Sequence, residues 1–179
     1  MEKEASPVIN PGKNEIITVD GVSYRRLCIK THVIKDGDSI PDVAMEYAAP
    51  HMQEGDVLFI TEKAVACTQK RAIPLKEIHP RPLARFLSKF VLKTPYGIGL
   101  AMPETMEMAL RECGTVRILF AAAVSAIGKL FGVRGWFYNI AGEKARAIDG
   151  PCDFTLPPYN EYVVLGPADP DKVAAEVSA

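Results

Sequence analysis

The stretch that decides the fold is residues 116–151, VRILFAAAVSAIGKLFGVRGWFYNIAGEKARAIDGP. Its first part, residues 118–127, is nearly all apolar or small, which predicts a segment covered by the rest of the protein. Its second part alternates glycines with the polar residues Arg134, Asn139, Glu143, Lys144, Arg146 and Asp149. Ligand sites tend to lie where a buried scaffold meets a polar loop. We therefore expect this stretch to contain both buried core residues and ligand-binding residues.

Short apolar runs predict most of the strands, because compact runs with few charges are typical of a sheet centre. The predicted strands of this kind are residues 57–61, 115–120, 136–140, 145–148 and 162–165. The small residues at 121–126 predict a closely packed helical turn, and residues 169–177 predict a terminal helix. Strands and helices alternate irregularly, which favours an α+β fold with a mixed β-sheet and flanking helices.

Turn and cap residues set several boundaries. Asp20-Gly21 tolerates positive φ and predicts a hairpin between residues 16–19 and 22–29. Ser39, with Asp42 three residues on, resembles a capping box that starts a short helix before Pro50. Leu83, Phe86, Leu87 and Phe90 predict a helix with a core-packing stripe over residues 83–92.

A further helix is predicted to begin at Pro103, because proline is favoured in the first helical turn. Its expected inner face is Met106, Ala109, Leu110 and Cys113, and Gly114 is placed to end it.

Composition narrows the function classes. The 179 residues carry a net charge of −1, so no overall basic character points to nucleic acid. The most apolar window is about half the length that a bilayer requires, so we expect no membrane span. Four cysteines without a CxxC pair suggest reduced thiols that serve packing and a cytoplasmic protein.

We expect residues 1–14 to form a flexible N-terminal arm and residues 15–179 a single domain, with two interlocked lobes as the alternative. The last residues fall within a predicted helix, which leaves a C-terminally truncated chain as an alternative. Gly128-Lys129 invites comparison with a phosphate-binding loop, but position 123 is alanine and Leu130 replaces the hydroxyl residue that would hold magnesium. Such a loop is therefore not predicted.

Three segments carry a resemblance to a known family. They are TEKAVACTQKR after DVLFI, then FGVRGWFYNIAGEKARAIDGP, and LPPYNEYVVLGP. Over residues 24–171 the sequence resembles the coenzyme F-420:L-glutamate ligase (F-420-0 gamma-glutamyl ligase, CofE-like) family, in its divergent bacterial members. The resemblance implies an intertwined α+β fold, commonly a homodimer, and amide formation between a small-molecule carboxylate substrate and L-glutamate. It also implies GTP as co-substrate, with Mg²⁺ or Mn²⁺, and an acyl phosphate intermediate.

The candidate site residues come from two sources. Thr61 and Lys63 match the segment shared with the better-known ligases, which implies nucleotide or substrate contact. By chemistry alone, Lys129, Arg134 and Arg146 are candidate anion binders, and Asp149 and Asp153 are candidate metal ligands. Ordinary surface charges, ion pairs and an Asp-Gly turn are the competing interpretations.

One part of the family pattern is missing from this sequence. The Asn- and Asp-rich segment of the ligases has no counterpart, and Glu104 and Glu107 are the only carboxylates where it would fall. Two hypotheses therefore stay open. The first is a GTP- and metal-dependent glutamate ligase. The second is a non-catalytic domain of the same fold that binds a small ligand or a partner protein.

Overall fold

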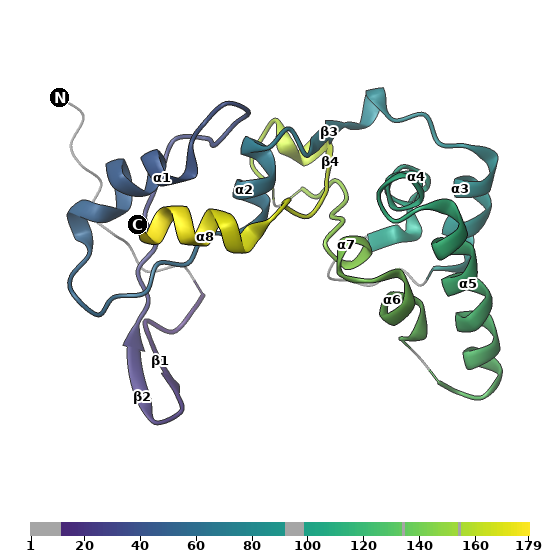
Figure 1. Cartoon of the computed structure of the whole chain (residues 1–179), viewed down its shortest axis with the longest axis horizontal. Helices are drawn as coiled ribbons and strands as arrows, with labels where there is room; N and C mark the ends of the chain where they lie inside the picture. The colour runs from purple at the N-terminus through teal and green to yellow at the C-terminus, as the bar shows by residue number, and fades with distance from the viewer. Residues whose placement is uncertain (1–11, 92–98, 134, 154) are drawn as a thin grey trace.

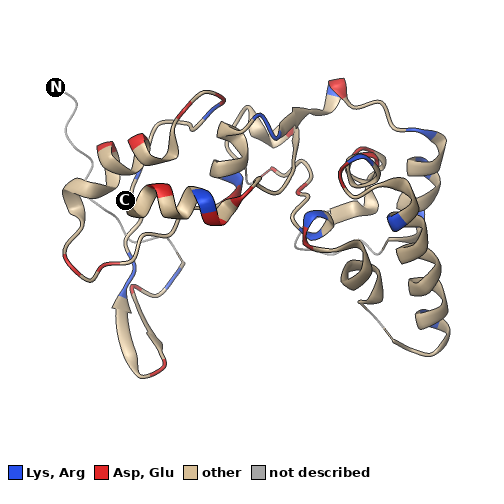
Figure 2. Ribbon diagram, viewed as in Figure 1, with Lys and Arg blue, Asp and Glu red and all other residues tan. Residues whose placement is uncertain are grey.

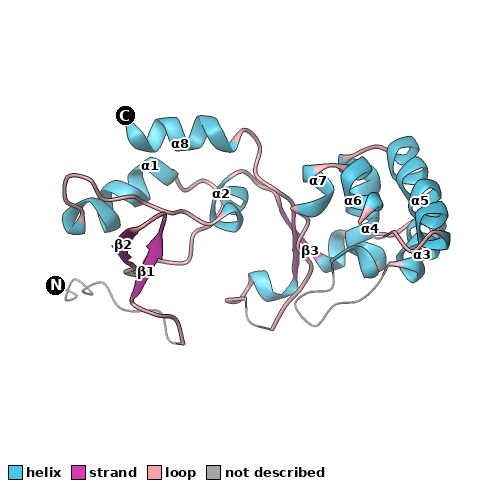
Figure 3. Ribbon diagram, turned by 90° about the horizontal axis from the view of Figure 1, so that it is seen from below, coloured by secondary structure: helices cyan, strands magenta, loops and turns pink. Residues whose placement is uncertain are grey.

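A computed structural model describes residues 12–91, 99–133, 135–153 and 155–179. The molecule is elongated (Figure 1). The N-terminal elements and the C-terminal helix gather at one end, and helices from the middle of the chain gather at the other. A quarter turn shows the same separation (Figure 3), with a small sheet between the two groups. The predicted N-terminal arm falls mostly outside the described residues.

The first element is a β-hairpin. Strands β1 (Ile16–Val19) and β2 (Val22–Arg25) pair antiparallel, with Ile17 opposite Tyr24. Asp20 and Gly21 take φ values of 51° and 80° in the turn, as a two-residue hairpin loop requires. The predicted hairpin is confirmed, and its second strand ends earlier than expected.

A short composite helix follows. Helix α1 (Ile40–Val43) continues through a π-helical turn (Ala44–Ala48) into a 3₁₀ turn (Ala49–His51). The Ser39 hydroxyl accepts a hydrogen bond from the Asp42 backbone N–H at 3.4 Å, so the predicted N-cap is confirmed. Figure 1 shows the C-terminal helix α8 (Pro170–Ser178) beside α1, and the predicted terminal helix is also confirmed.

The predicted strand at residues 57–61 is wrong. Residues 56–61 lie outside any strand, and helix α2 (Glu62–Thr68) follows directly. Val57 and Phe59 expose 63% and 89% of their surface, so their apolar character does not reflect burial within this chain. A strand is defined by its pairing, and among the described residues this segment has no pairing strand.

The sheet between the two ends joins distant parts of the sequence. Strand β3 (Ala72–Pro74) pairs antiparallel with β4 (Tyr162–Val164), with Ile73 opposite Val163. An isolated antiparallel bridge joins Asp149 to Val164. The predicted strand at the end of the chain is thus confirmed. The described strands form two small antiparallel pairs instead of one mixed sheet.

Helices from the middle of the chain form the other end of the molecule. They are α3 (Pro82–Leu87), α4 (Pro103–Glu112), α5 (Thr115–Leu130), α6 (Trp136–Ala141) and α7 (Glu143–Arg146). Short 3₁₀ turns lie at Leu75–Glu77, Ser88–Phe90, Gly99–Ala101 and Tyr159–Glu161.

Helix α4 lies at the centre of the hydrophobic core. Met106, Ala109 and Leu110 are buried, and they pack with Leu100 and Ile118 in one cluster. The predicted start at Pro103 and the predicted inner face are therefore confirmed, with Cys113 partly buried at the edge.

Residues 115–148 correct the strand predictions in the stretch that decides the fold. Residues 115–120 belong to helix α5, and residues 136–140 and 145–148 fall on α6, α7 and the turn after α7. A short apolar run does not distinguish strand from helix by periodicity, and the alanines at 121–123 favour helix. The expected complete burial is also wrong, since Phe120 and Ile127 expose 61% and 53% of their surface.

The α+β class is confirmed, with helices dominating the described residues. Within the described ranges, no single helix is long and apolar enough to cross a bilayer. The bent pair α4 and α5, which meet at 117°, passes that test only when the two helices are counted together.

Candidate active site

Helix α2 presents Lys63 at its first turn. The Thr61 hydroxyl accepts a hydrogen bond from the Ala64 backbone N–H at 3.3 Å, and Thr61 has the extended backbone of an N-cap. Thr61 therefore ends the extended segment and starts the helix. The sequence-predicted residue Thr61 has a local role in the structure, which is to set where Lys63 leaves the backbone.

Asp149 is held beside α2 by the sheet. Its backbone N–H donates to the Val164 carbonyl at 2.8 Å, and the Val164 N–H donates back at 2.9 Å. Because Val164 belongs to β4, this bridge fixes the chain after α7 at the edge of the sheet. The Asp149 carboxylate lies 2.5 Å from the Lys63 ammonium. Two candidates that are remote in sequence thus meet in the fold.

Thr155 provides a second oxygen to the same ammonium. Lys63 Nζ donates to Thr155 Oγ1 at 3.3 Å. The Lys63 side chain is 32% exposed and that of Asp149 is 50% exposed, so solvent reaches the pair. The result is a partly open cluster with one ammonium, one carboxylate and one hydroxyl.

A buried thiol and a phenol lie next to this cluster. Cys67 is one helical turn after Lys63 and is 4% exposed. Burial raises the pKa of the Cys67 thiol, while a hydrogen bond with Tyr159 and the charge of Lys63 act in the opposite direction. Burial also raises the pKa of Tyr159 to about 12, with further contributions from Cys67, Tyr162 and Asp38. Both groups are therefore protonated at neutral pH.

Lys63 and Asp149 form a charged outer layer of this cluster, and Cys67 and Tyr159 form a neutral inner layer. Lysine binds phosphate or carboxylate as a compact point charge, and an aspartate can hold a divalent cation or a substrate amine. Here Lys63 and Asp149 neutralise each other, so an incoming anion would compete with Asp149 for Lys63. Figure 2 shows basic and acidic segments mixed along the described ribbon, so this charge chemistry is local.

The other sequence-predicted cations are engaged elsewhere. Lys129 Nζ donates to the Phe90 carbonyl at 3.2 Å, which joins α5 to the 3₁₀ turn after α3. Arg146 donates to Glu143 at 3.0 Å and to Asn139 at 2.6 Å. Asp153 is exposed in the loop after Asp149, and Arg134 lies outside the described residues. The structure therefore brings together Thr61, Lys63 and Asp149 but not Lys129 or Arg146.

Glu107 is a buried carboxylate that is paired with two arginines. It is 1% exposed and accepts hydrogen bonds from the Arg81 backbone N–H at 3.1 Å, from Arg81 Nε at 3.0 Å and from Arg111 Nε at 2.9 Å. Burial opposes ionisation, but these donors together lower the pKa of the carboxyl group. The two arginines account for its charge, so Glu107 does not take the place of a metal-binding segment.

Sequence reasoning missed Thr155, Tyr159 and the position of Cys67. Lys63 and Cys67 are four residues apart, a spacing that places them on one helix face. The predicted strand at residues 57–61 lies directly before these residues, so the sequence did not indicate that a helix begins there. Thr155 and Tyr159 carried no comparable signal, since their loop is brought to α2 by the pairing of β4 with β3 and with Asp149, which joins residues remote in sequence.

Comparison with models of protein families shows which family the chain belongs to. The sequence model of the F420-0:Gamma-glutamyl ligase family matches residues 28–179. The match covers most of the chain and includes every residue of the Lys63 cluster. The chain belongs to the F420-0:gamma-glutamyl ligase family. The resemblance seen in the sequence is therefore confirmed.

One curated relative supports this family. The chain is 28% identical, over 144 residues, to a protein named coenzyme F420:L-glutamate ligase from Methanopyrus kandleri. The alignment covers 80% of this chain and 48% of the relative, so the chain spans about half the length of that relative. No solved structure matches the chain significantly.

The family resemblance implies a divalent metal, and Mg²⁺ and Mn²⁺ bind mainly to oxygen ligands. Among the described residues, no three His, Cys, Asp or Glu side chains gather as a metal cluster. Mg²⁺ commonly takes only one or two protein carboxylates and completes its shell with phosphate oxygens and water. Asp149, whose carboxylate is half exposed beside Lys63, is of the residue type for such a ligand, and Asp153 is exposed four residues further on.

Proposed function

We propose that this chain adds L-glutamate to a carboxylate of an F420-0-type acceptor, with GTP as the phosphoryl donor and Mg²⁺ or Mn²⁺ as the metal. The observation that carries the proposal is the family match, which covers all the elements that build the Lys63 cluster. The name of the Methanopyrus kandleri relative supports the same reaction class.

The reaction has two bond-forming steps. An oxygen of the acceptor carboxylate attacks the γ-phosphorus of GTP, the bond to the bridging oxygen breaks, and GDP leaves with that electron pair. The amino group of L-glutamate then attacks the carbonyl carbon of the acyl phosphate. The amide bond forms, phosphate leaves, and the nitrogen loses its extra proton. Both steps require positive charge near phosphate oxygens and close positioning of two reactants.

Lys63 is our candidate for the positive charge. Its ammonium is one-third exposed and is already held by two oxygens, those of Asp149 and Thr155. A phosphate or carboxylate oxygen can replace either partner without moving the backbone, because Lys63 reaches the cluster through a flexible side chain. The backbone of Asp149, anchored through Val164, would keep its position while the carboxylate stays free to turn.

Asp149 and Asp153 are our candidate metal ligands. When bound, Mg²⁺ or Mn²⁺ would neutralise charge on the phosphate oxygens. Asp149 is half exposed and can turn from Lys63 toward a second cation when an anion occupies Lys63. In this proposal, the ion pair is the resting arrangement and ligand binding separates its two members.

A mass-spectrometric coupling assay tests the proposal. The full chain is incubated with GTP, MnCl₂, L-glutamate and F420-0, and the products are scored for an added glutamyl unit and for GDP. We expect product with the natural chain and a loss of about 100-fold or more in both Lys63→Ala and Asp149→Asn. Lys172→Ala is the matched control, because Lys172 pairs with Glu176 on the exposed surface of α8.

The outcomes separate the two hypotheses. Product formation that depends on Lys63 and Asp149 supports the ligase. If no product forms while GTP still raises the melting temperature, the non-catalytic ligand-binding domain becomes the better account. If GTP neither reacts nor stabilises the chain, the ligase proposal is wrong for this chain.

A further inference from the structure

The antiparallel ladder of β3 and β4 ends at a cavity. Its last pair places Pro74 opposite Tyr162. Beyond this pair neither segment continues as a strand, because the chain enters the 3₁₀ turn Leu75–Glu77 on one side and leaves the 3₁₀ turn Tyr159–Glu161 on the other. Residues of both turns line a cavity of about 550 Å³. This volume is within the range of about 300–1,000 Å³ that is typical of small-molecule sites. We call it the β-end cavity.

The wall of the β-end cavity combines apolar surface with three polar side chains. The apolar surface comes from Leu75, Pro157, Pro158 and Tyr162. The polar side chains are those of Lys76, Asn160 and Glu161, which supply one ammonium, one amide and one carboxylate. Apolar surface with a few converging polar groups is the usual composition of a small-molecule site.

The three polar side chains have no partner among the described residues. In that part of the chain, none of them takes part in a side-chain hydrogen bond or an ion pair. Lys76 and Glu161 have opposite charges and line one cavity, yet they do not form an ion pair with each other. Two opposite charges that do not contact each other across a cavity suit a ligand that carries both charges.

The polar groups match an amino acid with an acidic side chain. Such an amino acid carries two carboxylates and one ammonium at neutral pH. The ammonium of Lys76 and the amide N–H of Asn160 can each donate to a carboxylate, and the carboxylate of Glu161 can accept from the ammonium. The methylene groups of the ligand would pack on the apolar wall. Inorganic phosphate or a nucleotide phosphate matches less well, because it carries no cation for Glu161.

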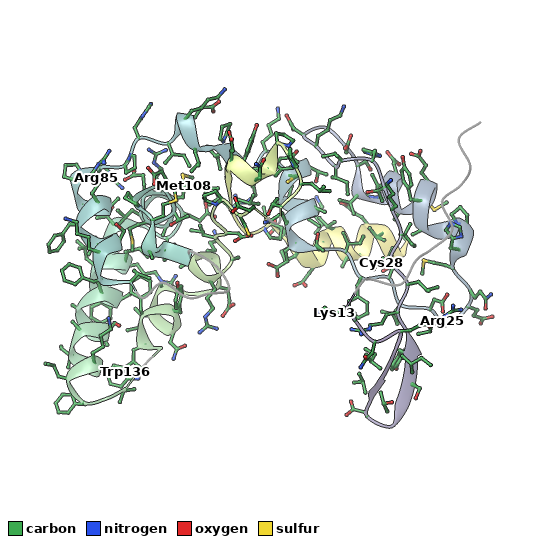
Figure 4. The ribbon with its side chains drawn as sticks, turned by 180° about the vertical axis from the view of Figure 1, so that it is seen from behind. Lys13, Arg25, Cys28, Arg85, Met108 and Trp136 are labelled. Atoms are coloured by element: carbon green, nitrogen blue, oxygen red, sulfur yellow. The ribbon has the colours of Figure 1, made fainter. Side chains whose placement is uncertain are left out.

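One loop joins the β-end cavity to the Lys63 cluster. Thr155 contacts Lys63, and Tyr159 forms a hydrogen bond with Cys67 on the same helix. Tyr159 also packs edge to face on Tyr162, a wall residue of the cavity, with the ring centroids 5.2 Å apart. Figure 4 shows the small sheet and this loop together between the two ends of the molecule. Residues of one loop therefore contact both the candidate active site and the cavity.

We propose that the β-end cavity holds L-glutamate, with Lys76 and Asn160 on its carboxylates and Glu161 on its ammonium. The inference rests on the proposed ligase function and adds to it the place of the second substrate, since the Lys63 cluster accounts only for phosphate and metal. In this arrangement Glu161 is a specificity-determining residue, because it selects an amino acid over a dicarboxylate that lacks the ammonium.

The test is ligand-observed NMR on the full chain with L-glutamate alone, by saturation transfer, which detects millimolar dissociation constants and requires neither nucleotide nor acceptor. We expect L-glutamate to bind to the natural chain. Glutarate has the two carboxylates but no ammonium, so it leaves Glu161 without a cation. Its dissociation constant should be about tenfold higher or more.

Two substitutions have different expected signatures. Lys76→Met should weaken the binding of L-glutamate and glutarate alike, about 10- to 100-fold, because both ligands lose the same carboxylate partner. Glu161→Gln should weaken L-glutamate by a similar factor and leave glutarate unchanged or more tightly bound, because only L-glutamate has the ammonium.

Glu77→Gln is the matched control, because Glu77 follows Lys76 in the same 3₁₀ turn but does not line the cavity. It should leave the binding of both ligands unchanged. The side chains of Lys76, Glu77 and Glu161 are exposed, so circular dichroism should show an unchanged fold in all three variants.

The coupling assay provides a second readout. Lys76→Met should raise the KM for L-glutamate about 10- to 100-fold, with little change in kcat or in the KM for GTP, because it removes a contact made equally in the ground state and the transition state. Lys63→Ala should instead lose kcat. An unchanged KM for L-glutamate in Lys76→Met overturns the assignment of the cavity.

The outcomes separate this inference from the ligase proposal. A chain that binds L-glutamate with the expected dependence on Lys76 and Glu161 but forms no product overturns the ligase proposal and supports the cavity as an amino-acid site. If L-glutamate does not bind to the natural chain, or binds equally well to Lys76→Met and Glu161→Gln, the assignment is wrong even when product forms.

Discussion

The ammonium of Lys63 and the carboxylate of Asp149 lie 2.5 Å apart, although one begins a helix in the N-terminal half of the chain and the other follows the last helix of the central group. The contact depends on the antiparallel bridge between Asp149 and Val164, which brings the returning chain to α2. The pair is therefore a product of the small sheet between the two ends of the molecule.

We predict that this pair contributes little to stability. Both side chains are partly exposed, and solvated ion pairs typically contribute about 0–1 kcal/mol. A double-mutant cycle of Lys63→Met and Asp149→Asn, measured by urea unfolding, should give a coupling free energy below about 1 kcal/mol. A coupling several times larger would show that the pair is a structural element, and the interpretation of lost activity in its variants would have to change.

The buried carboxylate of Glu107 should behave in the opposite way. Glu107→Gln removes the charge that Arg81 and Arg111 share and turns an amide group toward their donors. We expect the free energy of unfolding to fall by about 2–3 kcal/mol, less than for a fully buried pair because both arginines are about half exposed. Glu104→Gln, on the same helix, is the matched control and should change stability by less than about 0.5 kcal/mol.

The pH dependence of this effect has a definite sign. The pKa of Glu107 is lowered in the folded state, so its charge stabilises the fold above the unfolded pKa of about 4.3. That contribution is lost as the pH falls through the lower, folded pKa. Urea midpoints at a series of pH values from neutral to acid should show a gap between the natural chain and Glu107→Gln that narrows only below the unfolded value. A gap independent of pH would show that the carboxylate charge is not responsible.

Tyr159 should destabilise the fold at alkaline pH. Its pKa is raised to about 12, so the folded chain retains the neutral phenol while an unfolded chain ionises near pH 10. Stability should therefore fall as the pH rises from about 10 toward 12, and Tyr159→Phe should flatten this fall. Burial also raises the pKa of Tyr138, so ultraviolet titration of Tyr159→Phe should lose one late tyrosine and retain another. Tyr24→Phe on the exposed hairpin is the control, which should leave the late transition in place.

The sequence by itself determined the elements whose boundaries depend on local backbone chemistry. Asp20-Gly21 required the hairpin, the Ser39 hydroxyl capped its helix, and Pro103 began α4 with Met106 and Leu110 inward. The family resemblance was also present in the sequence, because short segments retain their residues even where the rest diverges. These features need no knowledge of the remainder of the chain, since each depends on residues only a few positions apart.

Only the tertiary structure decided which apolar runs are strands and which charged residues meet. Residues 115–120 and 136–140 have strand-like composition but lie in helices α5 and α6, because each packs on another helix and has no partner strand in the part of the chain that the structure describes. Thr155, Tyr159 and Asp149 lie against α2 where β4 pairs with β3 and with Asp149, and local propensity does not encode such contacts between distant segments. The exposed apolar side of α5, with Val116 and Leu130 at its two ends, likewise became visible only when the neighbours of the helix were known, because an apolar sequence predicts burial without stating what provides it.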